Sequence, residues 1–393
     1  MNKMTVKDVD LKDKTVLMRA DFNVPQDANL NITDDIRIRA TLPTIKYILE
    51  NGARKLILMS HLGRPDGKVV AKYSLKPVAV RLEELLGEPI KFLNDCVGDN
   101  IKKEIEAAKE RVILLENLRF HAEEEANDAG FAKQLASLAE VFVNDAFGTA
   151  HRGHASTEGV THYFKSAAGF LLEKEIEYLG NAVQNPKHPF MVILGGAKVS
   201  DKIGVIKNLL PKCDVILIGG GMAYTFLKAK GLPIGNSKLE KDKIDLAKGL
   251  MDEAKKLNKE IVLPIDNVVV EDIAPGAKVE TVGENIPEGK IAVDIGPKTI
   301  SLFKEKLKPA KTIVWNGPLG IFETDAFSQG TRQIAEFIAG LNCTTIIGGG
   351  DTAAAVAKFK LENKMTHIST GGGASLEYLE GKALPGIAAL SDK

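Results

Sequence analysis

Short apolar runs recur along the chain, and each is followed by a polar or glycine-rich turn and then by an amphipathic stretch. Examples in the first half are "KLILMSHLG", "RVILLENLRF" and "EVFVNDAFG", and in the second half "FMVILGGAK", "DVILIGGG", "TIVWNGPLG" and "TTIIGGGD". Runs that are apolar at consecutive positions favour strands covered on both faces. The amphipathic stretches between them predict helices, so we predict the α/β class with mainly parallel sheets covered by helices.

The residues that end these runs change near the middle of the chain. The first half ends its runs in Arg, His, Asp and Asn, whereas the second half ends them in glycine clusters. Between the halves, helical spacing followed by the helix-breaking stretch "QNPKHP" predicts a helix over 167–184. We therefore predict two domains, 1–170 and 171–377, linked by this helix; a helix internal to one domain is the alternative.

The stretch "MRADFNVP" ends a predicted strand with polar residues at every second position. Strand alternation places Arg19, Asp21 and Asn23 on one face. Further basic residues of the first half are Arg37 in "DDIRIRA", and His61, Arg64 and Arg119, which lie at the end of an apolar run or just past it. Arg152 and His154 in "AHRGH" follow the run "VFVNDAFG" by a few residues. Because ligands of parallel sheets bind beyond the carboxyl ends of the strands, these side chains predict one pocket.

This basic set suits a small, polyanionic, hydroxylated metabolite. Arg binds phosphate or carboxylate with two parallel hydrogen bonds, and an Asp–Asn pair suits a hydroxyl between two anionic groups. The alternative for each residue singly is a solvated or ion-paired side chain, with Asp21 serving only to pair Arg19.

Glycine turns of the second half predict a nucleotide phosphate site. "GGAKVSDK" follows a strand and opens a helix, where backbone N–H groups attract anions, and we expect Lys198 and Lys202 on one helix face. "LIGGGMAYTF" has glycines at Gly219 to Gly221, which let a flat ring approach the backbone. The glycines of "STGGGAS", Gly371, Gly372 and Gly373, repeat the device.

Two acidic residues complete the predicted nucleotide site. Asp351, beside Thr352 in "GGGDT", is the expected Mg²⁺ contact, and Glu323 could accept hydrogen bonds from ribose hydroxyls. The sequence lacks the GxxxxGK[ST] loop, the HRD and DFG motifs of protein kinases, and GxGxxG. A tight turn alone is the alternative for any single glycine cluster.

Composition excludes several classes of partner. Lys plus Arg number 52 and Asp plus Glu also 52, so no global basic field indicates nucleic acid or an anionic membrane. The three cysteines, Cys96, Cys213 and Cys343, are too far apart in sequence for a CxxC or zinc spacing. The start of the chain lacks the apolar core of a signal peptide and no apolar run is long enough to span a bilayer, so we expect a cytoplasmic protein.

The motifs together resemble those of the phosphoglycerate kinase family over essentially the whole chain. They appear in order as "RADFNVP", "LPTIKY", "SHLGRP", "ENLRF", "DAFGTAHR", "GGAKVSDKI", "GGGMAYTFLK", "WNGPLGIFE", "GGGDT" and "STGGGAS". The resemblance implies two Rossmann-like domains with the active site in an interdomain cleft. It also implies phosphoryl transfer between 1,3-bisphosphoglycerate and ADP, giving 3-phosphoglycerate and ATP, with Mg²⁺ and in a monomer.

The resemblance also assigns residues. In the first domain it implies that the glycerate is held by Asp21, Asn23, Arg37, His61, Arg64, Arg119 and Arg152. In the second it implies that Mg-nucleotide contacts Lys198, Lys202, Gly219, Gly220, Asn316, Glu323, Gly349, Gly350, Asp351 and Thr352. The tail 378–393, which by composition alone could fray, is implied to dock onto the first domain. One departure is Ala292 in "KIAVDIGP", where the family usually carries glycine.

Phosphoryl transfer explains why no Ser–His or Cys–His nucleophile is found, since catalysis is chiefly alignment and charge stabilisation. The expected charge stabilisers are Arg37, Lys202 and the amides of Gly371 to Gly373, with Lys198 on the nucleotide side. Hinge closure about the linking helix is expected to exclude water. The alternatives are a nicotinamide-dependent dehydrogenase and a non-catalytic module that binds a sugar acid.

Overall fold

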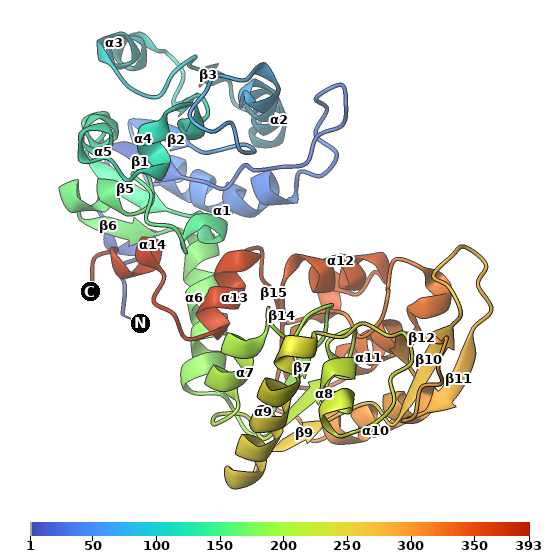
Figure 1. The fold of residues 1–393 in the computed structure, drawn as a ribbon. Helices are drawn as coiled ribbons and strands as arrows, with labels where there is room; N and C mark the ends of the chain where they lie inside the picture. The colour runs from blue at the N-terminus through green and yellow to red at the C-terminus, as the bar shows by residue number, and fades with distance from the viewer. Residues whose placement is uncertain (1) are drawn as a thin grey trace. The chain divides into compact units, whose positions relative to one another are not determined.

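The computed structural model describes residues 2–393, which form two compact units (Figure 1). The first unit extends to Glu177 and includes Ala383–Lys393, and the second is Tyr178–Lys382. Helix α6 (Phe170–Gln184) crosses the boundary. It begins later than the predicted residue 167 because Ser166–Ala168 form strand β6.

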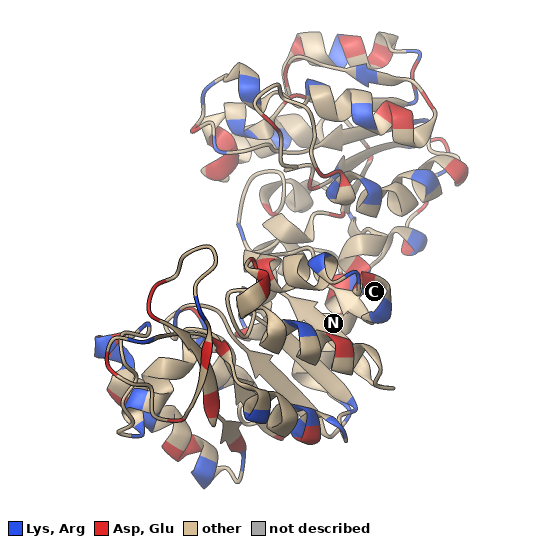
Figure 2. Cartoon of the chain, turned by 90° about the vertical axis from the view of Figure 1, so that its right-hand side faces the viewer, with Lys and Arg blue, Asp and Glu red and all other residues tan. Residues whose placement is uncertain are grey.

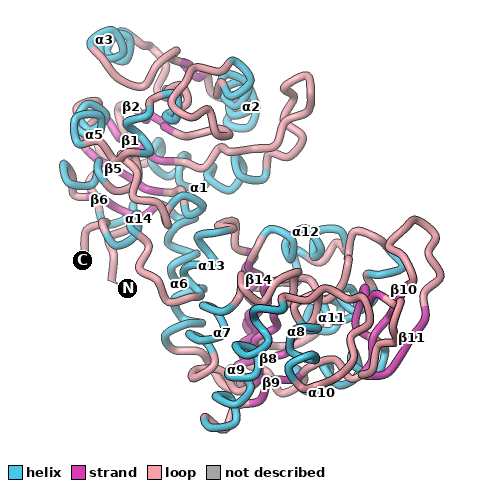
Figure 3. The backbone as a smooth tube through the Cα atoms, in the orientation of Figure 1, coloured by secondary structure: helices cyan, strands magenta, loops and turns pink. Residues whose placement is uncertain are grey.

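The first unit contains a six-stranded parallel sheet in the order β3-β4-β2-β1-β5-β6. Its other strands are β1 (Thr15–Arg19), β2 (Lys55–Met59), β3 (Ile90–Phe92), β4 (Val112–Leu114) and β5 (Val141–Asn144). Its helices are α1 (Ile36–Glu50), α2 (Lys76–Leu86), α3 (Asp99–Ala107), α4 (Ala122–Glu125), α5 (Ala129–Ala136) and α14 (Pro385–Ala388). Figure 3 shows the helices on both sides of this sheet.

Alternate residues of the central strands enter two separate cores, which explains why the runs are continuously apolar. In β1, Val16 and Met18 pack in the core shared with α1 and α2. Leu17, between them, packs in the core shared with α3 and α5. Full burial of each such side chain contributes about 1.5–3 kcal/mol, so both sheet faces must be covered.

The second unit contains a six-stranded parallel sheet in the order β15-β14-β13-β7-β8-β9. Its strands are β7 (Phe190–Leu194), β8 (Val215–Ile218), β9 (Glu260–Val262), β13 (Thr312–Asn316), β14 (Thr344–Gly348) and β15 (His367–Ile368). Its helices are α7 (Ile203–Leu209), α8 (Ala223–Ala229), α9 (Ile244–Lys256), α10 (Pro297–Leu307), α11 (Gln329–Ala339), α12 (Gly350–Lys358) and α13 (Gly373–Leu379). The predicted α/β class with mainly parallel sheets covered by helices is confirmed.

A small antiparallel sheet, which the sequence did not predict, adds to the second unit. It has the order β11-β10-β12 and consists of β10 (Asp266–Val270), β11 (Glu280–Gly283) and β12 (Ile291–Ile295). Ala292 lies in β12 opposite Val269, and its backbone N–H donates to Ser237 Oγ at 3.0 Å. The edge strand β11 is mostly exposed, so it lacks the apolar pattern that would have revealed it.

In each parallel sheet, the chain adds strands first on one side of the first strand and later on its other side. In the first unit the chain adds β2 on one side of β1 and later adds β5 on the other side. In the second unit β8 lies on one side of β7 and β13 on the other. Such a reversal opens a crevice outside the carboxyl ends of the two central strands, where ligands of open α/β sheets bind.

The C-terminal segment packs on the first unit. The backbone N–H of Gly386 donates to Ala150 O at 2.8 Å, and the amide of Asn144 donates to Gly386 O at 3.1 Å. Ile387 is fully buried. The segment belonging to this unit begins at Ala383, later than the predicted residue 378, because α13 stays with the second unit.

Charges of both signs are interspersed over the helices (Figure 2). This pattern agrees with the zero net charge and leaves any anion site to local clusters. Within residues 2–393, none of the helices is both long enough and apolar enough to cross a bilayer.

A buried carboxyl group supports the start of α6. Asp145 Oδ1 accepts from the backbone N–H groups of Leu171 and Leu172 at 2.9 and 3.2 Å. Those bonds favour the ionised form, but complete burial outweighs them and raises the pKa of Asp145 to about 7. The folded chain therefore holds a proton on Asp145 between about pH 4 and pH 7 that the unfolded chain has lost.

This proton makes a prediction about stability. The free energy of unfolding should fall as pH rises through that window and level off above it. The reason is that ionising Asp145 costs more free energy in the folded chain than in the unfolded chain. Asp145→Asn should therefore be more stable than wild type at pH 8, by up to about 4 kcal/mol, and nearly equal at pH 4. Urea unfolding at the two pH values measures the difference.

Asp128→Asn is the matched control, because Asp128 caps α5 from an exposed position by accepting from Phe131 N at 2.8 Å. It should show no gain at pH 8. An Asp145→Asn protein that is less stable than wild type at both pH values would contradict the assignment.

Candidate active site

Arg19, the last residue of β1, has a fully buried side chain that organises the polar residues around it. Its Nε donates to Ser156 Oγ at 2.8 Å, and its Nη1 donates to the carbonyl of Ala20. Its Nη2 lies 3.2 Å from His61 Nδ1. Asp21 acts on Arg19 through its charge but forms its ion pair with Arg37, so the alternative in which Asp21 serves only to pair Arg19 is wrong.

Glu124 is the buried countercharge of this arginine. Its carboxylate accepts from both the hydroxyl and the backbone N–H of Ser156, at 2.6 and 3.0 Å, and Ser156 in turn accepts from Arg19. Burial raises the pKa of Glu124 and lowers the pKa of Arg19, and the attraction between the two charges opposes both shifts. Ser156 thus links two buried charges, and each would be strongly destabilising without the other.

The contact between Arg19 and His61 fixes the protonation of the imidazole. Burial, followed by the positive charges of Arg19 and Arg119, lowers the pKa of His61 well below its usual range, so the imidazole is neutral. Because a guanidinium has only donors, His61 Nδ1 must accept from Arg19. The ring proton is therefore on Nε2, where it is available to donate to an anion.

Asp21 and Asn23 bind neighbouring parts of the same cluster. Asp21 Oδ2 pairs with Arg37 Nη1 at 2.6 Å, which brings the start of α1 to the end of β1. Asn23 Oδ1 accepts from Gly63 N at 2.9 Å, and Arg119 Nη1 donates to the carbonyl of Gly63 at 3.0 Å. The "SHLGRP" turn is therefore held between "DFNVP" and "ENLRF".

The charges of this cluster act on one another. The pKa of Arg119 is lowered first by burial, and the positive charges of Arg152 and Arg64 lower it further, against Glu125 and Glu124. The structure thus brings together all seven residues predicted for the glycerate: Asp21, Asn23, Arg37, His61, Arg64, Arg119 and Arg152. A concentration of mutually repelling guanidinium groups at the carboxyl edge of a sheet favours binding of an anion.

In the second unit, three glycine turns meet outside the central strands. Gly220 has φ +64°, and a Cβ there would lie 2.7 Å from Gly196 N and 2.8 Å from Pro318 O. Gly349 has φ +86°, and a Cβ there would lie 3.2 Å from Asn316 Nδ2. Only glycine permits the left-handed conformation of Gly220 together with such close backbone approach. The turns after β7, β8 and β13 therefore meet through their backbones, and the turn after β14 packs on the Asn316 side chain.

Lys202 and Asn316 form the polar centre of this surface. The Lys202 ammonium donates to Asn316 Oδ1, joining the segment before α7 to the end of β13. Burial lowers the pKa of Lys202, while Asp201, Asp351 and Glu380 oppose that shift. Asn316 Nδ2 is buried without a hydrogen-bond partner among residues 2–393, so a donor remains for a ligand.

Other predicted nucleotide residues occupy the same edge. Gly350, Asp351 and Thr352 form the first turn of α12, where Thr352 Oγ1 accepts from Gly317 N at 2.7 Å. Asp351 is exposed and its charge acts on Lys202, and its carboxylate offers the oxygen ligand type that Mg²⁺ prefers. Gly371 to Gly373 follow β15, and Gly373 begins α13.

One expectation about this half differs from the structure. Lys198 and Lys202 do not share a helix face, because α7 begins only at Ile203 and Lys198 lies in the irregular segment before it. A glycine pair followed by polar residues continues the turn beyond the point where sequence spacing suggested a helix. The side chain of Glu323 is exposed, and its contact with ribose hydroxyls stays a prediction.

The sequence did not reveal Glu124 or Ser156 as part of the site. "HAEEEA" reads as a solvated run of charges, and only the tertiary fold buries the middle one of its three glutamates. Ser156 lies in a loop without a recognisable motif. His154, whose pKa is lowered to about 3 by burial and then by Arg119 and Arg19, packs at the same place.

Comparisons with known proteins identify the family of this chain. The family model described as phosphoglycerate kinase matches residues 6–382. A phosphoglycerate kinase of Dictyoglomus turgidum is 59% identical over 99% of this chain and 98% of its own, and one of Koribacter versatilis is 57% identical over 100% of both chains.

Solved structures give the same result. The phosphoglycerate kinase structure from Coxiella burnetii has a TM-score of 0.91 at 42% identity and covers 99% of this chain and 98% of that chain. The one from Pyrococcus horikoshii OT3 has a TM-score of 0.84 at 33% identity and covers 98% of each chain. Since family model, sequences and structures agree over nearly the whole length, this chain belongs to the phosphoglycerate kinase family.

Proposed function

We propose that this chain catalyses reversible phosphoryl transfer between 1,3-bisphosphoglycerate and ADP, giving 3-phosphoglycerate and ATP. The observation that carries the proposal is a pair of anion sites of different chemistry, each at the reversal point of a parallel sheet. The first is a guanidinium cluster that suits a phosphorylated sugar acid. The second is a glycine-lined backbone surface with one buried lysine, which suits nucleotide phosphates.

In the first unit, the residues divide by what they can offer a glycerate. Arg64, Arg119 and Arg152 would neutralise its anionic groups. The Nε2–H of neutral His61 would donate to it without adding charge. Asp21 and Asn23 would bind the hydroxyl, while their bonds to Arg37 and Gly63 hold both side chains in place.

Arg37 and Lys202 are proposed to stabilise the charge that develops on the transferring group, together with the amides of Gly371 to Gly373. Lys198 would assist from the nucleotide side. Both nucleophile and leaving group belong to the substrates, so the protein needs only to align them and to balance charge. The carboxylate of Asp351 would hold Mg²⁺, which neutralises charge on the nucleotide phosphates when bound.

The two substrates must meet during turnover for direct in-line transfer. We therefore propose that the units close on each other about α6, with the region of Thr370 sharing the movement. Small-angle scattering should show compaction when both substrates are present, and an unchanged scattering profile would reject closure. Action as a monomer in the cytoplasm stays a prediction.

A coupled assay with 3-phosphoglycerate and Mg-ATP tests the proposed reaction directly. ADP should form only when both substrates are present, and Mg-ADP but not NAD should raise the melting temperature, since only a bound ligand stabilises the folded chain. Stabilisation by NAD would indicate the dehydrogenase alternative. Binding of the glycerate without ADP formation would indicate the non-catalytic alternative.

Substitutions of two arginines should separate catalysis from binding. Arg37→Ala should lower kcat by about 10²–10³-fold, because a preorganised charge at the transferring group acts mainly in the transition state. Arg64→Ala should mainly raise KM for 3-phosphoglycerate, because a ground-state phosphate contact stabilises substrate and transition state alike. Steady-state kinetics of the purified proteins measure both constants.

Arg39→Ala is the control for these variants. Arg39 lies on the same helix as Arg37, is 53% exposed and pairs with Asp35 at 2.8 Å, so both kinetic constants should stay at wild-type values. Near-normal turnover of Arg37→Ala would remove Arg37 from the catalytic role.

Glu124 is expected to act as a positioning residue. Glu124→Gln keeps the size of the side chain but leaves Arg19 buried without its countercharge, so the free energy of unfolding should fall by about 3–5 kcal/mol. KM for 3-phosphoglycerate should rise as well, while KM for ATP should not, because Arg19 positions only His61 in the glycerate cluster.

Glu123→Gln is the matched control, since Glu123 is the exposed neighbour on the same short helix. It should change neither stability nor either KM. If the free energy of unfolding of Glu124→Gln lies within about 0.5 kcal/mol of the wild-type value, the range of ordinary surface substitutions, the role of Glu124 as countercharge is contradicted.

A further inference from the structure

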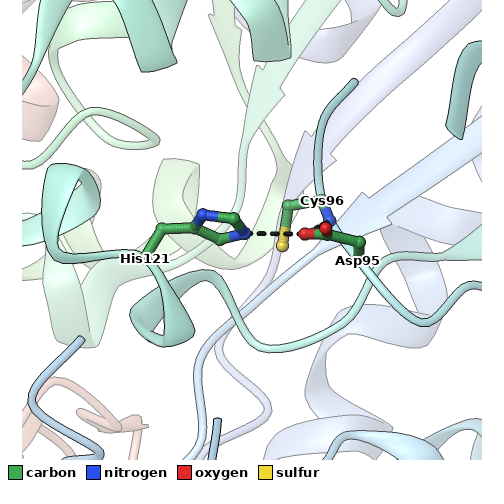
Figure 4. Close-up of side chains that lie close together, drawn as sticks. All are labelled: Asp95, Cys96 and His121. Carbon is green, nitrogen blue, oxygen red and sulfur yellow. Dashed lines mark hydrogen bonds and ion pairs between the residues drawn. The ribbon is translucent and has the colours of Figure 1, made fainter. Parts of the chain in front are cut away.

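Three potential metal ligands lie together in the first unit, outside both predicted substrate clusters. Asp95 and Cys96 follow β3, and His121 follows the short 3₁₀ helix Leu118–Phe120. One ligand atom from each residue lies within 4.8 Å of the other two. Figure 4 shows the three side chains pointing toward one another.

The contacts of these residues hold them in orientations suited to ligation. Asp95 Oδ1 accepts from the backbone N–H of Cys96 at 2.7 Å and lies 2.6 Å from His121 Nε2. Cys96 Sγ donates to Glu116 O at 2.9 Å. The His121 ring packs against the Phe131 ring with centroids 5.0 Å apart, which fixes the plane of the imidazole.

The Asp95–His121 pair is already close to the spacing of two ligands in a tetrahedral metal site. Nitrogen and oxygen ligands of one tetrahedral Zn²⁺ lie about 3.3 Å apart, given metal–ligand distances of about 2.0–2.2 Å. His121 and Asp95 would therefore separate by roughly 0.7 Å as the metal replaced the proton between them. The thiol would release its proton to water on binding, because the thiolate is the ligand.

The ligand types select the metal. A thiolate with an imidazole and a carboxylate suits Zn²⁺ or Co²⁺, whereas Mg²⁺ and Ca²⁺ prefer oxygen ligands alone. Cys96 is fully buried at the base of the cluster, while the side chains of His121 and Asp95 are 28% and 52% exposed. The exposed side leaves room for metal entry and for water as a fourth ligand.

We propose that Asp95, Cys96 and His121 form a binding site for a divalent transition metal of the zinc class, with water as the fourth ligand. The site does not rest on the proposed kinase activity. It lies two residues from Arg119 through His121, so an occupied site would hold the "ENLRFH" segment to the turn after β3.

Cobalt binding to the full-length chain tests the proposal without an activity measurement. After treatment with a chelator, CoCl₂ is added in the presence of excess Mg²⁺, which occupies oxygen-only sites. A single equivalent should produce the visible bands of tetrahedral Co²⁺ and a near-ultraviolet thiolate-to-cobalt charge-transfer band. Added Zn²⁺ should abolish both.

Variants assign the ligands. Cys96→Ser should remove the charge-transfer band, and His121→Gln and Asp95→Asn should each weaken Co²⁺ binding by more than about tenfold. Cys213→Ser, which alters another buried thiol, and His162→Gln, which alters another His paired with a carboxylate, should bind like wild type. Circular dichroism verifies folding, and Asp95→Asn at its exposed position keeps the test valid if Cys96→Ser does not fold.

Two results would overturn the proposal. One is a wild-type protein that shows no charge-transfer band, which would leave the Asp95–His121 contact as a simple ion pair. The other is a band that persists in Cys96→Ser or is unaffected in both His121→Gln and Asp95→Asn.

Discussion

The guanidinium of Arg19 is buried completely at the end of a parallel strand, and the organisation of the first site depends on how that charge is balanced. Glu124 provides the opposite charge through Ser156, and Arg19 in turn fixes the tautomer of His61. If Arg19 lost its countercharge, the end of β1 would carry an unpaired charge in a medium of low polarity, which is strongly destabilising. The chemistry of the proposed glycerate site therefore rests on two buried charges that Ser156 connects.

The second site also offers a polar surface for an anion, but that surface is formed mainly by the backbone and not by long side chains. Gly195, Gly220 and Gly317 let three turns approach so closely that a Cβ at any of them would lie within 2.7 Å of a backbone atom of a neighbouring turn. Backbone N–H groups and one lysine then provide the polar surface. In the proposed function, the first site would bind with long side chains held by buried partners and the second with the backbone itself, which suits a metabolite and a nucleotide respectively.

Much of the fold could be predicted from sequence because parallel strands covered on both faces leave an unambiguous apolar signal. Most of the predicted glycerate cluster could be predicted because His61, Arg64 and Arg119 follow such strands closely in the sequence. Glu124 could not, because its burial depends on the loop that carries Ser156, and local sequence does not encode that contact. Lys198 was placed on a helix because spacing alone cannot show how far a glycine turn extends before the first helical hydrogen bond.

The cysteines also show that local sequence does not encode contacts between segments that are distant along the chain. Their wide spacing argued against a metal site, but spacing describes only ligands that are close along the chain. Cys96 and His121 approach because β3 and β4 are neighbours in the sheet and their following segments meet at the same edge. A site assembled from two crossover connections leaves no motif.

The central claim is that both substrates bind at the carboxyl edges of the two parallel sheets. Amide chemical-shift mapping of the isotope-labelled chain tests it most directly. Adding 3-phosphoglycerate should perturb amides near Asp21, Gly63 and Arg119, and adding Mg-ADP should perturb those near Gly196, Gly220 and Thr352. Perturbations confined to the opposite edges, near Thr15 and Lys55 for the glycerate or near Phe190 and Thr312 for the nucleotide, would contradict the account.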